Sequence, residues 1–283
     1  MRRSIQRVLL TGAGGFIGSH IHTRLAACRS IDLITSHDDS PIGRSFDLET
    51  SGAIHLAVKN CAPDLVIHTA AVTSIAQCET DPATALRVNT AATEEIATAL
   101  QATGGRLILF STDQVFDGEN APYDSQAATS PLHTYGRSKT QAEQAAAILN
   151  EHAVVLRPSL VLGKSPQGSR TPEELLLLAH ATGQPLPLFH DEIRSPIQVS
   201  DVVNVTLALC RTWRSGVLHI GGPSNLSRFD LGLALCKRLQ LPPSTTITRS
   251  SRSTLAHPER RPRDLSLISE DTWNYLGQLP IAP

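Results

Sequence analysis

The chain has 283 residues, a formal net charge of -1 and 41% hydrophobic residues. That composition predicts a globular protein with a full core. No apolar run reaches the roughly 20 residues that span a bilayer. The sequence has no block of basic residues of the kind that binds nucleic acid. Five scattered cysteines without a CxxC pair argue against a disulfide framework or a structural zinc site, so we expect a cytoplasmic protein with reduced thiols.

Short apolar runs alternate with helical patterns through about residue 160. The expected strands cover 7–11, 31–35, 64–68, 106–111 and 153–157. The expected helices between them cover 16–28, about 50–60, 82–102 and 135–151. Near-continuous apolar strands are typical of a sheet that is covered on both faces. The repeat therefore predicts an α/β fold with a doubly wound parallel (Rossmann) sheet and right-handed crossovers.

The pattern becomes irregular after residue 163. The elements expected there are a helix at 171–183 opened by Thr171, a helix at 200–213 capped by Ser200, a strand at 216–222 and a turn at 241–244. Polar caps and a closing glycine are the usual helix boundaries. The expected domains are a dinucleotide-binding domain over 1–163 and a smaller substrate-binding lobe over 164–283, with about 197–222 returning to the first domain.

The stretch RVLLTGAGGFIGSHI places a glycine turn between the first expected strand and its helix. Gly12, Gly15 and Gly18 follow a GxxGxxG spacing. Such a turn lets the backbone pass close to a pyrophosphate, while the helix N-terminus supplies free N–H groups. An ordinary βα turn is the alternative. The position of the turn, after the first strand of a β-α-β series, favours dinucleotide binding.

The tip of the second expected strand bears on the choice of coenzyme. A carboxylate there would accept hydrogen bonds from the ribose of NAD and repel the 2′-phosphate of NADP. This chain has Ser36 and His37 at the tip, with Asp38 just beyond and Arg44 farther along. Hydroxyl, imidazole and guanidinium groups suit a phosphate, so NADPH is favoured over NADH. A merely solvated loop at 36–46 is the alternative.

Two polar features follow. The segment STDQVFDG puts polar residues at the end of the fourth strand, where open α/β sheets bind ligands. Farther on, Tyr135 and Lys139 share one helix face, one turn apart. A lysine ammonium beside a tyrosine lowers the phenol pKa from near 10, which suits a proton donor to the alkoxide formed when hydride reduces a ketone. A surface pair is the alternative for an isolated Tyr-x-x-x-Lys.

The chain resembles the extended short-chain dehydrogenase/reductase superfamily, and within it the dTDP-4-dehydrorhamnose reductase branch. Eight segments carry the resemblance in the family's order: TGAGGFIG at 11–18, FDL at 46–48, HTAAVTSIAQCETDPATALRVN at 68–89, STDQVFDG at 111–118, YGRSK at 135–139, LRPSLVLG at 156–163, DEIRSPIQVSDV at 191–202 and RPRDLSL at 261–267. The resemblance implies an NAD(P)H-dependent reductase that transfers hydride to the keto group of a nucleotide-linked 4-keto-6-deoxy sugar.

The resemblance also implies a cofactor site drawn from several segments. Asp47 and Leu48 would border the adenine ring, and Asn89 would support the hydrogen-bond network of the active site. A helix-surface amide is the alternative for Asn89. The residues implied to bind the cofactor are Gly12, Gly15, Phe16, Ile17, Gly18, Ser36, His37, Asp47, Leu48, Ala71, Val72, Thr73, Asn89, Tyr135 and Lys139.

For the reaction itself, the resemblance implies that Thr112 donates a hydrogen bond to the carbonyl oxygen, Tyr135 delivers the proton and Lys139 tunes Tyr135. Related sugar-nucleotide dehydratases carry Thr-Asp-Glu where this chain has a glutamine at 114, so elimination is disfavoured. Guanidinium groups suit a diphosphate, although a salt bridge is the alternative for each arginine. The residues implied to bind substrate are Thr73, Thr112, Asp113, Leu160, Arg194 and Arg261.

The match fails on the sugar side of the implied pocket. Leu160 stands where the rhamnose-forming reductases have a tryptophan, and Ala76 stands where an acid is common. A reductase or epimerase acting on a different, non-sugar ketone therefore remains an alternative, as does a cofactor-binding regulatory subunit like that of methionine adenosyltransferase. The eleven histidines show no HxxxH or HExxH spacing, so no catalytic metal is expected. A homodimer is expected by analogy.

Overall fold

A parallel sheet forms the centre of the first of two units in this computed structural model, which describes residues 5–35, 46–168, 170–257 and 261–283. The first unit consists of residues 1–112, 133–157 and 203–218. The second consists of residues 113–132, 158–202 and 219–283. No helix in the described part of the chain is both long enough and apolar enough to cross a membrane.

The sheet has six strands in the order β10-β5-β4-β3-β1-β2. Their bounds are β1 Arg7–Thr11, β2 Asp32–Thr35, β3 Leu65–His68, β4 Arg106–Phe110, β5 Ala153–Pro158 and β10 Gly216–Ile220. The strands from β2 to β5 pair in parallel. The strand order reverses between β1 and β3, and ligands bind at such a reversal, outside the carboxyl ends of the strands. The predicted fold class is thereby confirmed.

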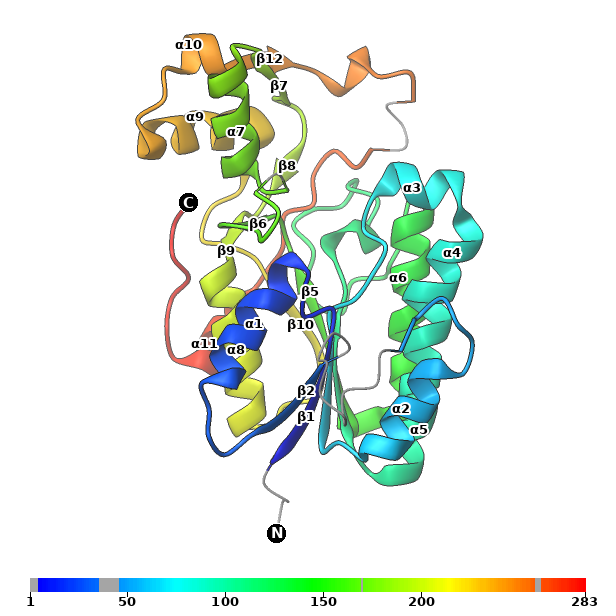
Figure 1. Ribbon diagram of the computed structural model, residues 1–283. Helices are drawn as coiled ribbons and strands as arrows, with labels where there is room; N and C mark the ends of the chain where they lie inside the picture. Colours follow the sequence, from blue (N-terminus) through cyan, green and yellow to red (C-terminus); the bar gives the residue numbers. More distant parts are fainter. Residues whose placement is uncertain (1–4, 36–45, 169, 258–260) are drawn as a thin grey trace. The chain divides into compact units, whose positions relative to one another are not determined.

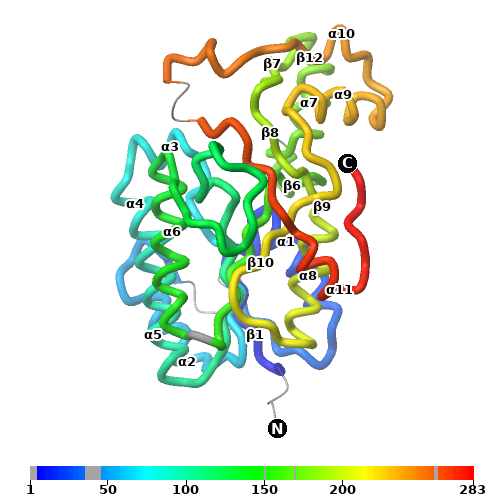
Figure 2. The backbone as a smooth tube through the Cα atoms, turned by 180° about the vertical axis from the view of Figure 1, so that it is seen from behind, coloured from blue at the N-terminus to red at the C-terminus, as the bar shows by residue number. Residues whose placement is uncertain are grey.

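Helices cover both faces of the sheet (Figure 1; Figure 2 from behind). On one face lie α2 (Ala53–Cys61), α5 (Ala92–Thr103) and α6 (Thr134–Ala146), and on the other lie α1 (Phe16–Ala26) and α8 (Val199–Arg211). These two layers bury the strands. Apolar strand side chains such as Leu9 and Val66 are fully excluded from solvent. They pack with Ile54, Ile96 and Ala142 from the three helices of the first face.

The helical stretch expected at 82–102 is interrupted. It starts with α4 (Pro82–Leu86), passes through a π-helical turn at Arg87–Ala91 and continues as α5. A further helix, α3 (Ile75–Thr80), precedes it and is capped by the Ser74 side chain, which accepts from the Gln77 N–H. π-Turns inside helices are rare and occur frequently at functional sites.

The second unit contains small sheets and short helices. Parallel strands β7 (Leu186–Phe189) and β12 (Ile247–Ser250) pack with α7 (Pro172–Thr182), α9 (Arg228–Leu239) and α10 (Pro243–Thr246) around an apolar cluster that includes Leu176, Leu188 and Leu235. The remaining elements are β6 (Val161–Leu162), β8 (Ile193–Arg194), β9 (Ile197–Gln198), β11 (Leu226–Ser227), α11 (Glu270–Leu276) and the 3-10 turns Asp113–Val115, Ala147–His152 and Arg252–Thr254.

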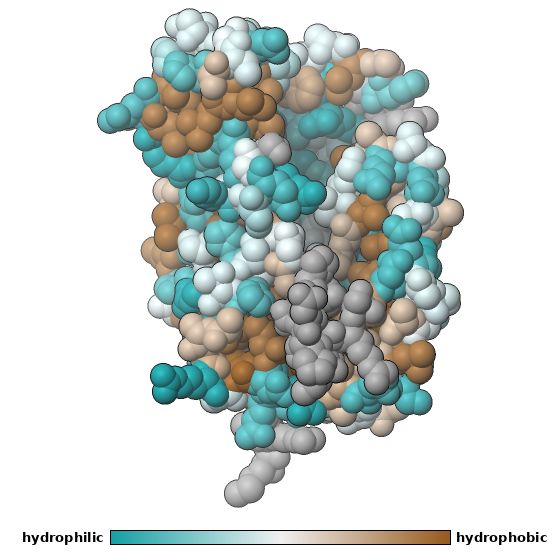
Figure 3. All heavy atoms as spheres, in the orientation of Figure 1, coloured by the Kyte–Doolittle hydropathy of each residue, from teal (hydrophilic) through white to brown (hydrophobic). Residues whose placement is uncertain are grey.

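Helix α7 has the boundaries that its sequence predicts. Thr171 and Glu174 form a reciprocal capping box, and Gly183 ends the helix in the left-handed conformation at φ 66°. Two of its leucines, Leu177 and Leu178, remain 47% and 52% exposed and contribute to the apolar patch over this helix in Figure 3.

Two boundary predictions are wrong. Ser200 does not cap α8, because the helix already begins at Val199. The turn expected at 241–244 gives way to α10 at Pro243, since a proline fits the first turn of a helix, where its missing N–H costs nothing. The strand expected at 216–222 and the helix start near residue 135 agree with β10 and α6.

Truncating the buried core is expected to be costly. Leu9 is 0% exposed, so Leu9→Ala should lower the free energy of unfolding by about 2–5 kcal/mol. The matched change Leu177→Ala, at a side chain that is 47% exposed, should stay within about 0.5 kcal/mol. Urea denaturation of both variants measures the difference, and equal losses would contradict this account of the core.

Candidate active site

The glycine turn brings the backbone of β1 against the segment that follows β3. Gly12 has φ +72°, and a Cβ there would lie 2.6 Å from Thr69 Oγ1 and 2.7 Å from the Ala70 nitrogen. A Cβ on Gly18 would overlap the Gly12 carbonyl oxygen. Gly15 caps α1 without a side chain, and the helix has no acid in its first turn. The free N–H groups at this helix start, beside a turn that only glycine permits, fit a pyrophosphate.

Tyr135 lies in the first turn of α6, and this turn is fixed from both sides. The His133 side chain accepts a hydrogen bond from the Gly136 N–H at 3.1 Å, and Glu79 accepts one from the Thr134 N–H at 2.7 Å. The ring of Tyr135 is 9% exposed and belongs to an apolar cluster with Cys78 and Ala85. Packing and capping together hold the phenol in place before any ligand binds.

Asn89 sits in the π-turn and is fully buried. Its side-chain oxygen accepts from the Val72 N–H at 2.8 Å, while its amide donates to the Val72 carbonyl at 3.0 Å and to Ser138 Oγ at 2.9 Å. Ser138 Oγ in turn donates to the Tyr135 carbonyl at 2.8 Å. The structure therefore overturns the surface-amide alternative, because Asn89 joins the segment after β3 to the helix that carries Tyr135.

Lys139, one turn beyond Tyr135, is 1% exposed. Its ammonium group makes no hydrogen bond to another described residue. Burial lowers the pKa of Lys139 to about 8, and the charge of Glu143 opposes that shift. Burying an ammonium that donates no hydrogen bond to the described residues is costly, so Lys139 fits the ribose hydroxyls of a nicotinamide cofactor.

Thr112 and its neighbour Ser111 are buried at the end of β4. Ser111 Oγ donates a short hydrogen bond to Glu143 of α6. Glu143 also pairs with Arg157 at the end of β5, at 2.6 Å from Nη2 and 3.0 Å from Nε. The strand end that carries Thr112 is thus joined to the helix that carries Tyr135 and Lys139.

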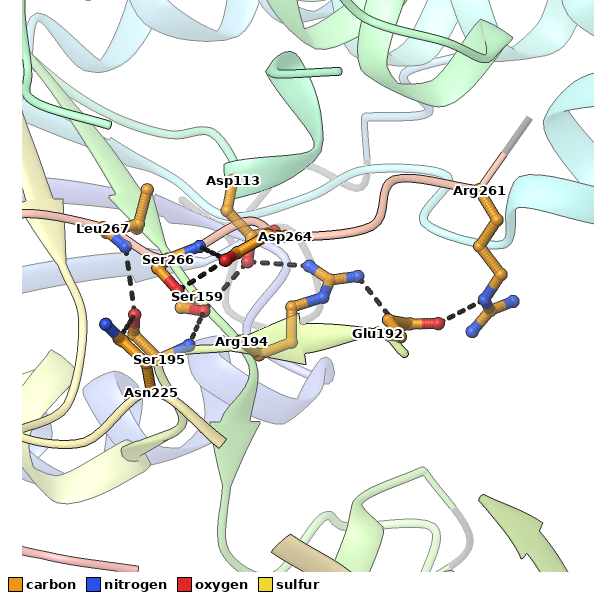
Figure 4. A network of polar contacts seen from close by, with 10 residues as sticks. All are labelled: Asp113, Ser159, Glu192, Arg194, Ser195, Asn225, Arg261, Asp264, Ser266 and Leu267. Atoms are coloured by element: carbon orange, nitrogen blue, oxygen red, sulfur yellow. Dashed lines mark hydrogen bonds and ion pairs between the residues drawn. The ribbon is translucent and has the colours of Figure 1, made fainter. Parts of the chain in front are cut away.

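In the second unit, a polar network surrounds Asp113 (Figure 4). Asp113 Oδ2 accepts from Arg194 Nη1 at 2.7 Å and from Ser159 Oγ at 2.9 Å. Arg194 also reaches Glu192 at 3.4 Å, and Glu192 binds Arg261. Arg194 and Arg261, both predicted to bind substrate, are therefore engaged in ion pairs within this unit, as their salt-bridge alternative describes.

The other predicted residues are spread over both units. Ser36 and His37 lie outside the described residues, as do Asp38 and Arg44. Asp47 and Thr73 are exposed; Phe16, Ile17, Leu48, Ala71 and Val72 are partly buried. Leu160 packs on the apolar cluster of the second unit. Among the residues that the structure describes, no cluster of histidine, cysteine, aspartate and glutamate has the arrangement of a metal site.

Four contributors to the site were absent from the prediction: Ser111, Ser138, Glu143 and Arg157. Glu143 had a signal in the sequence, because it stands four residues after Lys139 as Lys139 stands four after Tyr135. Ser111 belongs to the polar strand end that the sequence singled out, but its contact with Glu143 and that of Arg157 had no signal, since they arise only through the tertiary fold.

Comparison with known proteins gives a consistent result. The family described as RmlD substrate binding domain matches residues 6–282. A dTDP-4-dehydrorhamnose reductase of Mycobacterium tuberculosis is 30% identical, covering 98% of this chain and 89% of its own. A probable low-salt glycan biosynthesis reductase, Agl14, of Haloferax volcanii is also 30% identical, covering 95% and 91%.

A solved structure shares the fold. The dTDP-4-dehydrorhamnose reductase of Bacillus anthracis, in complex with NADP, has a TM-score of 0.85 and 24% identity, covering 97% of this chain and 94% of that one. Together with the glycine turn and the Tyr135–Lys139 helix, these findings define an NAD(P)-dependent oxidoreductase of the short-chain dehydrogenase/reductase class. Within that class, the chain belongs to the RmlD family.

The glycine turn can be tested by a matched pair of substitutions. A methyl group on Gly18 would overlap the Gly12 carbonyl, whereas a Cβ on Gly14 would meet nothing within 4 Å. Gly18→Ala should weaken NADPH binding at least about tenfold, the equivalent of about 1.4 kcal/mol, and Gly14→Ala should not. Fluorescence titration with NADPH measures both, and equal affinities would show that the close approach is unimportant.

The buried side chain of His68 should make the free energy of unfolding depend on pH. It bonds to Thr11 at 2.7 Å in the buried sheet, and burial, followed by the charge of Lys139, lowers its pKa to about 3 from 6.5. The unfolded chain therefore binds more protons, so stability should fall as pH drops below about 6.5, with a limiting slope near ~1.4 kcal/mol per pH unit. His68→Asn should show a shallower decline between about pH 6.5 and 5 in urea titrations; an unchanged slope would contradict this.

Proposed function

We propose that the protein is an NADPH-dependent reductase of the keto group of a nucleotide-linked 4-keto-6-deoxy sugar. The observation that carries the proposal is the construction of α6, where Tyr135 is fixed by capping and packing and the buried Lys139, one turn away, donates no hydrogen bond to another described residue. The relatives that share the chain over nearly its whole length are named as reductases.

The chain's residues would divide the reaction between them. Bound NADPH supplies the hydride that adds to the carbonyl carbon. Thr112 donates a hydrogen bond to the carbonyl oxygen and stabilises the charge that develops there. Tyr135 gives its phenolic proton to the same oxygen, so that ketone, hydride and proton become the alcohol. Lys139 stabilises the phenolate that remains and binds the ribose hydroxyls of the cofactor.

The surroundings of Asp113 favour reduction over dehydration. Elimination of water requires acid and base groups that are free to exchange protons. Asp113 is 2% exposed, and its carboxylate is occupied by hydrogen bonds from Arg194 and Ser159. The next residue is Gln114, an amide that does not titrate. The chain therefore supports a single reduction step.

The preference for NADPH rests on the residues after β2. The strand ends at the neutral Thr35, and Ser36 and His37 follow, with Arg44 farther along. The absence of a carboxylate directly at the strand tip leaves room for the 2′-phosphate. Comparing kcat/KM with NADPH and with NADH tests this part, and a higher value with NADH would overturn it.

The nucleotide-sugar substrate is proposed from the relatives' names, while Leu160 stands where the resemblance implies a tryptophan in the rhamnose-forming enzymes. The first assay therefore follows NADPH oxidation at 340 nm with dTDP-4-keto-6-deoxyglucose and with its epimerised 4-keto product. Turnover with either supports the proposal. Turnover only with ketones that carry no nucleotide would replace it with a different reductase.

Tyr135→Phe isolates the chemical step. Loss of the proton donor should lower kcat by about 10²–10⁴-fold, with NADPH affinity within about threefold of the wild type. Tyr275→Phe, at a partly exposed tyrosine of α11, is the matched control and should keep full activity. If wild type and Tyr135→Phe bind NADPH alike but neither turns over any ketone, the regulatory-subunit alternative is supported instead.

A further inference from the structure

We propose that Glu143 is a positioning residue of the reductase: its carboxylate joins the strand end bearing Thr112 to helix α6 and places a negative charge one helical turn beyond Lys139. This inference rests on the proposed function, because the step it serves is the proton transfer from Tyr135. The residues that carry it all belong to the first unit.

Glu143 extends a regular series along one helix. Tyr135, Lys139 and Glu143 are spaced four residues apart on α6, so they lie on one face in successive turns. The Glu143 side chain is 10% exposed and that of its partner Arg157 is 5% exposed. The phenol of Tyr135 is therefore followed by an ammonium, a carboxylate and a guanidinium group, whose charges alternate in sign, in a buried region.

The Glu143 carboxylate is bound on both oxygens. Oε1 accepts from Ser111 Oγ and from Arg157 Nε at 3.0 Å, and Oε2 accepts from Arg157 Nη2 at 2.6 Å. Three elements meet at this group, because Ser111 follows β4, Arg157 ends β5 and Glu143 lies on α6. Thr112 is the residue directly after Ser111, so the carboxylate fixes the position of its backbone.

Glu143 also supplies the attractive charge that acts on Lys139. Burial alone favours the neutral amine, and Glu143 opposes it. The other titratable groups that face the lysine are His68 at the end of β3, neutral because burial lowers its pKa to about 3, and Tyr135 on α6. Arg157 pairs with Glu143 and offsets part of its charge. Without Glu143, the described groups around Lys139 leave its ammonium without an opposing charge.

A purely structural ion pair would behave differently. Buried pairs cost desolvation, and apolar replacements of similar size are often neutral in stability. If Glu143 served stability alone, its loss would move the unfolding temperature and leave the titration of Lys139 unchanged. A positioning role moves the titration of the lysine and the pH dependence of kcat.

Selective labelling makes the titration measurable. The chain has four lysines; Lys59, Lys164 and Lys237 are exposed, and Lys139 is buried. In protein labelled with ¹³Cε-lysine, the Lys139 resonance can be assigned from its absence in Lys139→Met and followed by NMR across pH 6 to 11. Glu143→Gln should lower the Lys139 pKa from about 8 by about one pH unit. The matched control Glu94→Gln, at an exposed glutamate of α5, should leave it in place.

Kinetics provide the second measurement. In Glu143→Gln the alkaline limb of kcat should move to lower pH by the same amount as the lysine titration. Ser111→Ala keeps the charge but removes the link to β4, so it should lower kcat about tenfold with little change in KM and no change in the Lys139 titration. If Glu143→Gln alone does not fold, the double variant Glu143→Gln/Arg157→Gln takes its place in both measurements. The pKa of Lys139 should also be lower in this double variant than in the wild type.

The two proposals can fail separately. The lysine titration uses the free protein, so it reports on Glu143 even if the wild type reduces no nucleotide sugar. An unchanged Lys139 titration in both Glu143 variants, with only the unfolding temperature lowered, would overturn the positioning role. A shifted titration in a protein that turns over no ketone would keep the role of Glu143 and overturn the proposed reductase.

Discussion

The first unit is organised around the burial of one charge. A buried ammonium group must find opposing charge or hydrogen bonds, and Lys139, which is 1% exposed, makes no hydrogen bond to another described residue. The surrounding side chains are arranged accordingly: His68 stays neutral and Glu143 supplies the opposing charge. Packing of α6 against the sheet therefore creates an unsatisfied donor that a cofactor's hydroxyl groups can satisfy.

Carboxylate–arginine pairs anchor the strand ends in both units. Arg157 pairs with Glu143 in the first, and Arg194 pairs with Asp113 in the second. Each pair is almost completely buried, so removing either arginine would take away a buried charge that opposes the carboxylate. The peptide that links Thr112 to Asp113 thus has a buried ionic anchor on either side, through Ser111 on one and through Asp113 itself on the other.

Local patterns in the sequence were sufficient for the strands and for placing Tyr135 and Lys139 one turn apart on one helix, because period, turn chemistry and helical spacing are properties of neighbouring residues. They were insufficient for contacts at long range. Arg194 and Asp113 are 81 residues apart, and nothing in either segment indicates that they pair. The π-turn around Asn89 could not be predicted from the sequence either. It is stabilised by hydrogen bonds of Asn89 to Val72 and Ser138, and the residues of the turn itself have no distinctive composition.

The polypeptide passes between the two units five times, after residues 112, 132, 157, 202 and 218. Neither unit is a continuous segment, so neither can be excised or exchanged as a single stretch of chain. A change in substrate specificity therefore has to come from single substitutions, because the chain alternates between the two units. A proteolytic cut anywhere between residues 113 and 218 leaves two fragments that each carry parts of both units, which favours unfolding of the whole chain as one cooperative event.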